Sequence, residues 1–234
     1  MFVYAQEHEN AATPLPSATV VVIREGECGI EALLLKRNPA LRHMPGMWVF
    51  PGGKIDSDDP GDSPEVQARF AAAREAKEEA GLALSDAELI DFSHWLTPLV
   101  MKRRFATWFY LVAIDPDTDI TVDGEEIVDY RWVSPEQALA EQVSGELPMS
   151  PPTFISLHDL SGWSAVTEAT KAVSERIPPY FFPNVVKHED ESVFLYPGDS
   201  GYEMGDATST TVLHRARMIE GGIHYRRDFE WPSR

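Results

Sequence analysis

Residues 52–82 constrain the fold of this chain most, because a glycine pair, an acidic loop and a helix follow one another there. Ser63 suits the N-cap of the helix, Pro64 its first position and Gly81 its end. Apolar residues at spacings of three and four predict one stripe that packs on the core. The members of this stripe are Val66, Phe70, Ala73, Ala76 and Ala80.

Three glutamates share one face of this helix, because Glu75, Glu78 and Glu79 stand at positions i, i+3 and i+4. At about 100° per residue, we expect that face roughly opposite the apolar stripe. Carboxylates this close repel one another unless a cation lies among them, and Arg74 supplies part of that charge. A divalent ion supplies more, since Mg²⁺ and Mn²⁺ prefer carboxylate oxygens together with substrate phosphates. The alternative is an acidic helix face that only water contacts.

The stretch resembles the Nudix box, in which a glycine and a glutamate precede the run Arg-Glu-U-x-Glu-Glu-x-Gly-U, where U is aliphatic. Gly53 and Arg74 are separated by seven more residues than in that pattern, and Val66 stands where the pattern has its first glutamate. The added residues fall in the acidic loop 56–62, where extra length costs little free energy. The matching positions are Gly53, Arg74, Glu75, Ala76, Glu78, Glu79, Gly81 and Leu82.

This resemblance implies an α/β fold, the Nudix-type α/β/α sandwich with a mixed sheet, over roughly residues 17–142. It also implies metal-dependent hydrolysis of a pyrophosphate bond in a nucleoside diphosphate that is linked to another moiety. Arg74 and Glu75 then count as catalytic residues, with Arg74 bracing the glutamates. The ligands of Mg²⁺ or Mn²⁺ are then Glu75, Glu78, Glu79 and the carbonyl of Gly53.

A general base in this family is often a glutamate on a later loop. Glu126 is the candidate, because it stands just before a strand that ends in Trp132, and Glu125 is its close rival. The alternative for residues 123–126 is an acidic turn without a catalytic role.

The residues before the box indicate a substrate. Arg42-x3-Gly46-x3-Phe50-Pro-Gly-Gly resembles the signature of Nudix enzymes that cleave coenzyme A and its acyl esters, although Leu35 stands where threonine is usual. We expect guanidinium and ammonium groups of this region to contact phosphate, and the alternative is that they only solubilise loops. The substrate-binding candidates are Arg37, Arg42, Lys102, Arg103 and Arg104.

Two other functions stay open at this point. The chain is alternatively an ADP-ribose or dinucleotide pyrophosphatase, which product analysis distinguishes from a coenzyme A diphosphatase. It is alternatively a non-catalytic module that binds nucleotides, although such domains usually lose glutamates of the box and all three are present here.

The formal net charge of −18 repels nucleic acid and anionic membranes, but a few placed cations still admit a small phosphorylated substrate. No apolar run approaches the ~20 residues that span a bilayer, and the first residues do not resemble a secretory signal. Cys28 is the single cysteine, which excludes an internal disulfide and fits a reducing compartment. We therefore expect a cytoplasmic protein that acts on a small nucleotide-type molecule, without nucleic-acid or membrane partners, and we leave a homodimer open.

Proline-rich residues 148–152 suggest a boundary, so we divide the chain into a tail at 1–16, a Nudix hydrolase domain at 17–147 and an extension at 148–234. The extension carries no catalytic motif, and we expect it to pack on the same domain. Its expected elements are a helix over 163–176, strands over 192–196, 209–219 and 223–229, and a hairpin turn at 220–222.

Overall fold

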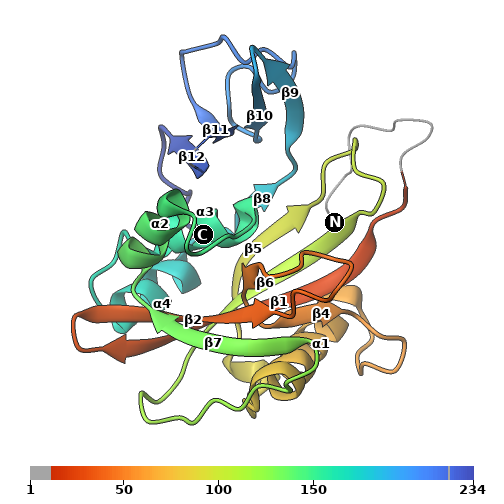
Figure 1. The fold of residues 1–234 in the computed structure, drawn as a ribbon, viewed down its shortest axis with the longest axis vertical. Helices are drawn as coiled ribbons and strands as arrows, with labels where there is room; N and C mark the ends of the chain where they lie inside the picture. The colour runs from red at the N-terminus through yellow and green to blue at the C-terminus, as the bar shows by residue number, and fades with distance from the viewer. Residues whose placement is uncertain (1–11, 221) are drawn as a thin grey trace.

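The computed structural model describes residues 12–220 and 222–234, and its main body is a mixed sheet between two layers of helices (Figure 1). The order along the sheet is β3-β2-β1-β6-β5-β8, with β4 paired to β1 and β7 paired to β2. The pairs β1·β6 and β5·β8 are parallel and the others antiparallel. The strands are β1 (Leu15–Gly26), β2 (Gly29–Arg37), β3 (Trp48–Val49), β4 (Gly52–Lys54), β5 (Ile90–Leu96), β6 (Phe105–Ala113), β7 (Ile127–Val133) and β8 (Tyr180–Phe181).

Alternation along β1 divides the core into two layers, because successive strand side chains point to opposite faces of a sheet. Val20 and Val22 pack with the alanines of one helix, while Val21 and Ile23 pack with residues of three other helices. The expected α/β/α sandwich is therefore confirmed. One face carries α1 (Pro64–Ala80), the other carries α2 (Pro135–Ser144), α3 (Pro151–Leu160) and α4 (Val166–Glu175), and a short 3₁₀ turn, η1 (Asp86–Glu88), follows α1.

Helix α1 has the predicted caps, but its buried face differs from the predicted stripe. The Ser63 side chain accepts the N–H of Val66, and Gly81 ends the helix in the left-handed conformation with φ 72°. Val66 is 40% exposed, whereas five alanines and Glu79 are buried. Short alanine side chains let the helix approach the sheet closely, and this rotation puts Glu79 at the edge of the buried face instead of opposite it. The buried alanines are Ala68, Ala71, Ala72, Ala76 and Ala80.

The C-terminal residues form more structure than the predicted helix and hairpin. The helix α3 was not predicted, because its proline pair was interpreted as a boundary and not as a helix start, and α4 begins only at Val166. Residues 180–181 also join the main sheet as β8 beside β5, and this strand was not predicted. The expected hairpin is half of a second, antiparallel sheet in the order β12-β11-β10-β9 (top of Figure 1). Its strands are β9 (Asn184–His188), β10 (Glu191–Leu195), β11 (His214–Ile219) and β12 (Gly222–Arg227).

The boundaries at residues 16 and 147 stay predictions, and most of the predicted tail, residues 1–11, lies outside the described residues. Within the described chain, none of the helices is long and apolar enough to cross a membrane. The cytoplasmic location and the homodimer likewise stay predictions.

A buried histidine on β5 predicts how stability depends on pH. His94 is 3% exposed, stacks on Tyr180 and meets the edge of Trp108, and burial lowers its pKa from 6.5 to about 4. The unfolded chain binds a proton below about pH 6.5, so the stabilisation is present above that pH and is lost as the pH falls towards 4. Unfolding by urea at pH 7 and pH 5 should show a pH-dependent loss that is about 2 kcal/mol smaller in His94→Phe than in wild type.

The phenylalanine keeps the ring contacts and removes the titration. A matched control is His224→Phe, because His224 is exposed on β12, and this variant should keep the wild-type pH dependence. Equal pH dependence in wild type and His94→Phe would contradict the assignment of this loss to His94.

Candidate active site

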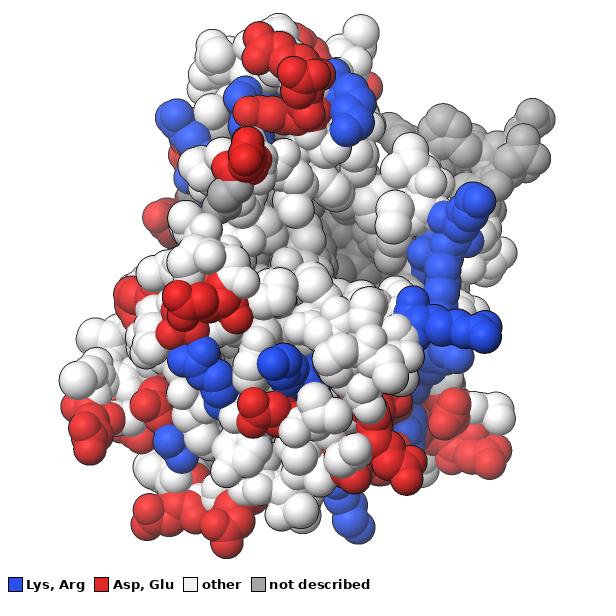
Figure 2. Space-filling view, in the orientation of Figure 1, with Lys and Arg blue, Asp and Glu red and all other residues white. Residues whose placement is uncertain are grey.

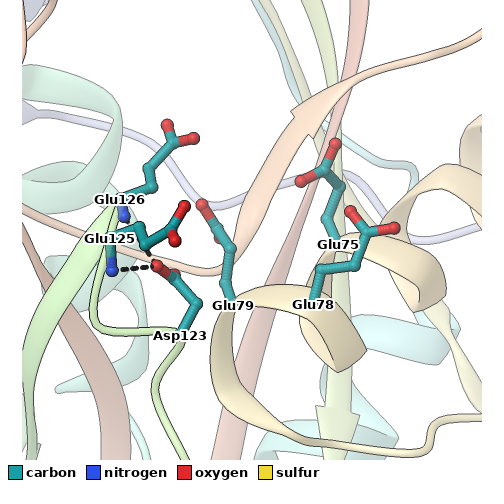
Figure 3. A pocket seen from close by; sticks show the side chains of 6 residues that line it. All are labelled: Glu75, Glu78, Glu79, Asp123, Glu125 and Glu126. Atoms are coloured by element: carbon teal, nitrogen blue, oxygen red, sulfur yellow. Dashed lines mark hydrogen bonds between the residues drawn. The ribbon is translucent and has the colours of Figure 1, made fainter.

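Six carboxylates from two parts of the chain line one cavity of about 230 Å³. Glu75, Glu78 and Glu79 project from the last turns of α1, and the loop before β7 faces them across the cavity (Figure 3). The structure therefore brings together the predicted helix glutamates and both predicted loop glutamates. The loop side is lined by Asp123, Glu125 and Glu126.

Glu79 is the most enclosed of these carboxylates. It is 5% exposed, and its Oε2 accepts the backbone N–H of Gly52 at 2.8 Å. Burial raises the pKa of Glu79 to about 8, against the opposing effect of the Gly52 hydrogen bond, and the charges of Glu75 and Glu126 raise it further. A carboxylate in this position is costly to ionise unless a cation lies beside it.

Gly53 lies against the Glu75 carboxylate, so a larger residue at position 53 would require the Glu75 side chain to move. A Cβ at position 53 would stand 2.3 Å from Oε1 of Glu75 and 2.5 Å from its carboxyl carbon. The backbone of Gly53 is held by β1, where it pairs with Ala18. Gly53 thus allows the backbone of β4 and the Glu75 carboxylate of α1 to lie in direct contact.

Arg74 joins the helix glutamates to the acidic loop. Its Nη1 lies 2.9 Å from Glu75 Oε1 and 3.1 Å from Glu78 Oε2. Its Nε and Nη2 bind both carboxylate oxygens of Asp59 at 2.9 Å and 3.1 Å, and Nη2 also donates to the Lys54 carbonyl. Hydrogen bonding by Asp59 raises the pKa of Arg74 above its ordinary value.

Asp59 is a site residue that the sequence did not reveal. Loop 56–62 was interpreted as an insertion of little consequence, yet Asp59 is 7% exposed within it and also accepts the N–H of Asp56. Hydrogen bonding by Arg74 holds its pKa below the usual range although burial alone would raise it. Spacing alone gave no signal, because the partner of Asp59 is 15 residues away along the chain.

The loop before β7 is an acidic turn that also lines the cavity, and a general base on it stays a prediction. The Asp123 carboxylate accepts the backbone N–H groups of Glu125, Glu126 and Ile127, and this aims both loop glutamates at the cavity (Figure 3). Glu126 forms an ion pair of 2.7 Å with Arg37. Arg37, a predicted phosphate ligand, therefore contacts a loop glutamate, and only 13% of its side chain is exposed.

The other predicted substrate ligands fall into two groups. Arg42, Lys102 and Arg103 are exposed on loops. Arg104 is 6% exposed and donates to the carbonyls of Thr97 and Ala12, so its charge is directed into the protein's own backbone. Figure 2 shows Lys and Arg side chains in a strip along one side of the molecule, which ends beside an acidic patch.

Contacts connect one of these exposed cations, Arg103, to the cavity. The guanidinium of Arg103 lies over the ring of Phe105 at 5.0 Å, and the ring of His43 meets the same phenylalanine at 5.7 Å. The His43 carbonyl accepts Nε of Arg37, which binds Glu126. Burial lowers the pKa of His43, and so do the charges of Arg103 and Arg37. His43 and Phe105 were not predicted, and only their place beside predicted cations could have indicated them.

The donors of the cavity suit a hard divalent cation by their chemistry, because every lining side chain is a carboxylate. Among the residues that the structure describes, no three acidic, histidine or cysteine side chains lie close enough to coordinate one ion as they stand. Glu75 and Glu78 bind Arg74 instead, and rotation about their side-chain bonds would bring them towards Glu79. The strongest reason to expect a cation is that six carboxylates line this one cavity, with Glu79 enclosed among them.

Comparison with known proteins gives the same picture. Residues 13–151 match the family described as NUDIX domain. Acyl-coenzyme A diphosphatase NUDT19 of Xenopus laevis is 24% identical over 297 residues, covering 82% of this chain and 77% of that protein. The human NUDT19 is 24% identical over 272 residues, covering 74% of this chain and 72% of its own length. Putative nudix hydrolase 7 of Caenorhabditis elegans is 28% identical, and the match covers 55% of each chain.

Among solved structures, the NUDIX hydrolase from Alicyclobacillus acidocaldarius has a TM-score of 0.64 at 24% identity, covering 69% of this chain and 97% of that one. This likeness supports the fold only. The family match spans more than half of the chain, and it contains both sides of the carboxylate cavity. The chain therefore belongs to the Nudix family and is a Nudix hydrolase.

Proposed function

We propose that this Nudix hydrolase cleaves the pyrophosphate bond of coenzyme A or of an acyl-coenzyme A. The products are 3′,5′-ADP and phosphopantetheine or its acyl form. The observation that carries the proposal is the group of exposed cations, Arg42, Lys102 and Arg103, of which Arg103 is connected to the carboxylate cavity through Phe105, His43 and Arg37. In an otherwise acidic protein, such a group suits a substrate with a phosphate beyond its diphosphate. The names of the NUDT19 relatives agree with this substrate class.

Glu75, Glu78, Glu79 and the Gly53 carbonyl are the groups that would hold a divalent ion in this reaction. A bound Mg²⁺ or Mn²⁺ ion would neutralise the phosphate oxygens and lower the pKa of an attacking water. Arg74 orients Glu75 and Glu78 from its anchor on Asp59. Glu126 accepts the proton of the attacking water as general base.

The substrate proposal is tested by products. The purified protein is given coenzyme A, acetyl-coenzyme A, a long-chain acyl-coenzyme A, ADP-ribose and NADH with Mg²⁺ or Mn²⁺, and the products are separated by chromatography. Release of 3′,5′-ADP from the coenzyme A species, at a higher kcat/KM than for the other substrates, supports the proposal. Faster release of AMP from ADP-ribose or NADH would replace it with the ADP-ribose or dinucleotide alternative.

Recognition of the 3′-phosphate gives a sharper prediction. A charge-assisted contact is worth ~1.5–3 kcal/mol, so wild type should prefer coenzyme A over 3′-dephospho-coenzyme A by roughly 10- to 150-fold in kcat/KM. At least one of Arg42→Ala, Lys102→Ala and Arg103→Ala should narrow this preference.

The control Arg226→Ala removes an exposed arginine of β12 and should keep the preference. Arg104→Ala is expected to act on stability, because its guanidinium holds backbone carbonyls of two segments. Equal kcat/KM values on the two substrates in wild type would exclude recognition of the 3′-phosphate.

A further inference from the structure

We propose that Arg37 and Asn38 are positioning residues that make Glu126, and not its neighbour Glu125, the loop glutamate that acts as base. Both glutamates line the cavity, so their position along the chain does not decide between them. The inference rests on the proposed function in one respect, namely that a loop glutamate takes a proton. It does not depend on which nucleotide the enzyme cleaves.

The first observation is a bulge where β2 meets β7. Lys36 pairs with Asp129, but the next residue, Arg37, pairs with Ile127, so Val128 is an extra residue in the ladder. A bulge of this kind offsets everything on one side of it by one residue. Glu125 and Glu126 lie immediately before the offset residue Ile127, so the bulge sets where the loop that carries them meets β2.

Asn38 holds the backbone of the offset segment. Its N–H donates to the carbonyl of Glu126 at 2.8 Å, and its Nδ2 donates to the carbonyl of Glu125 at 2.8 Å. Its Oδ1 accepts the N–H of Ala40, which fixes the amide in that orientation. The backbone N–H and the side-chain amide of Asn38 therefore bind the carbonyls of Glu126 and Glu125, and this fixes both residues in the offset register.

Arg37 holds the carboxylate of the selected glutamate. The Nη2–Oε1 distance to Glu126 is 2.7 Å, and no ion pair of Arg37 with Glu125 is found among the described residues. The Nε of Arg37 donates to the His43 carbonyl at 3.3 Å, so the same guanidinium also fixes the loop that carries Arg42. Arg37 therefore acts on the base and on the phosphate-binding loop together, without itself being the phosphate ligand.

Asp123 holds the opposite side of the turn through the N–H groups of residues 125–127. The loop glutamates are thus held by their N–H groups from one side and by their carbonyls from the other. The carboxylate of Glu126 also interacts electrostatically with Glu75 and Glu79 on the far side of the cavity. What distinguishes Glu126 from its neighbour is its ion pair with Arg37, which is not found for Glu125 among the described residues.

The experiment compares the effects of removing each loop glutamate on kcat in three backgrounds. Glu125→Gln and Glu126→Gln are made in wild type, in Asn38→Ala and in Arg37→Gln, and kcat and KM are determined on the best substrate of the wild-type enzyme. In wild type, Glu126→Gln should have a kcat about thirtyfold or more below that of Glu125→Gln. In the Asn38→Ala and Arg37→Gln backgrounds, the ratio of these two kcat values should fall to about threefold, because the loop then presents either glutamate to the attacking water. Asn38→Ala alone should lower kcat about tenfold with KM changed less than about twofold.

Matched controls remove similar contacts far from the cavity. Asn184→Ala deletes an amide that likewise donates to a single backbone carbonyl, that of Tyr202 at 2.9 Å. Arg24→Gln deletes an ion pair of 2.8 Å with Glu31 between neighbouring strands. Both should leave kcat and the Glu125/Glu126 ratio at the wild-type values. Arg37→Lys, which keeps the positive charge, should restore most of the ratio lost in Arg37→Gln.

The outcomes separate the two proposals. An unchanged Glu125/Glu126 ratio in Asn38→Ala and Arg37→Gln would overturn positioning by these residues, even where kcat falls. Equal activity of Glu125→Gln and Glu126→Gln in the wild-type background would overturn it as well. If the wild-type enzyme prefers ADP-ribose, only the substrate proposal fails, and the ratio is measured on ADP-ribose. Urea unfolding of each variant identifies a loss of kcat that comes from misfolding.

Discussion

In Glu79→Gln, kcat should fall by about a hundredfold or more, which is on the order of 3 kcal/mol of transition-state stabilisation. The glutamine keeps the size of the side chain, and its oxygen still accepts the N–H of Gly52, so the local geometry is retained. The variant loses only the negative charge in the most enclosed position of the cavity, where a cation is least screened by water. The measurement is kcat as a function of Mg²⁺ or Mn²⁺ concentration for wild type and variant.

Glu65→Gln is the matched control, because Glu65 is an exposed glutamate in the first turn of the same helix. It should keep the wild-type kcat and metal dependence. If Glu79→Gln retained both as well, Glu79 would not be a metal ligand. The fold should not suffer from the change, because burial already disfavours the charged form of Glu79 and raises its pKa to about 8.

Glu126→Gln should lower kcat by about a hundredfold, because an amide cannot accept the proton of the attacking water. Its carbonyl oxygen can still accept a hydrogen bond from Arg37, so the loop should stay in place. The metal concentration that gives half-maximal activity should change little, which distinguishes a base from a metal ligand. The measurement is kcat at saturating metal together with that half-maximal concentration.

Glu125→Gln is the natural comparison, since it removes the same charge from the adjacent position of the same cavity. We expect it to change kcat by less than about threefold. If instead Glu125→Gln proved the sensitive variant, the loop would be the right one and the residue wrong. A strong shift in metal affinity for Glu126→Gln would assign it to the metal.

The sequence predicted local capping correctly, whereas periodicity predicted the buried face of α1 only in part. Helix α1 begins and ends where Ser63, Pro64 and Gly81 indicated. The α/β/α sandwich with a mixed sheet was expected from the resemblance to the Nudix box, and the structure confirms it. The direction of the α1 core face was wrong, because alanines carry little periodic signal and the closeness of helix and sheet is a property of the packed fold.

What the sequence did not predict depends on contacts between distant segments. Asp59 could not be assigned as the partner of Arg74, since its loop position gave no periodic signal. Arg37 and Arg104 were grouped with Arg42 by charge, whereas the structure directs them to Glu126 and to backbone carbonyls. The proline pair that opens α3 was ambiguous, because proline both ends one segment and suits the first turn of the next helix.

The contact between Gly53 and Glu75 has a consequence for how such enzymes are recognised in genomes. A search that counts residues between the two halves of the motif rejects this chain, because its acidic loop is seven residues longer than the pattern. In space the two residues are adjacent, since a Cβ at position 53 would overlap the Glu75 carboxylate where it now lies. The Arg74–Asp59 pair holds part of the added loop against the helix. The loop can therefore vary in length without separating Gly53 from Glu75. Searches of predicted proteomes for further members should therefore test this contact instead of the spacing.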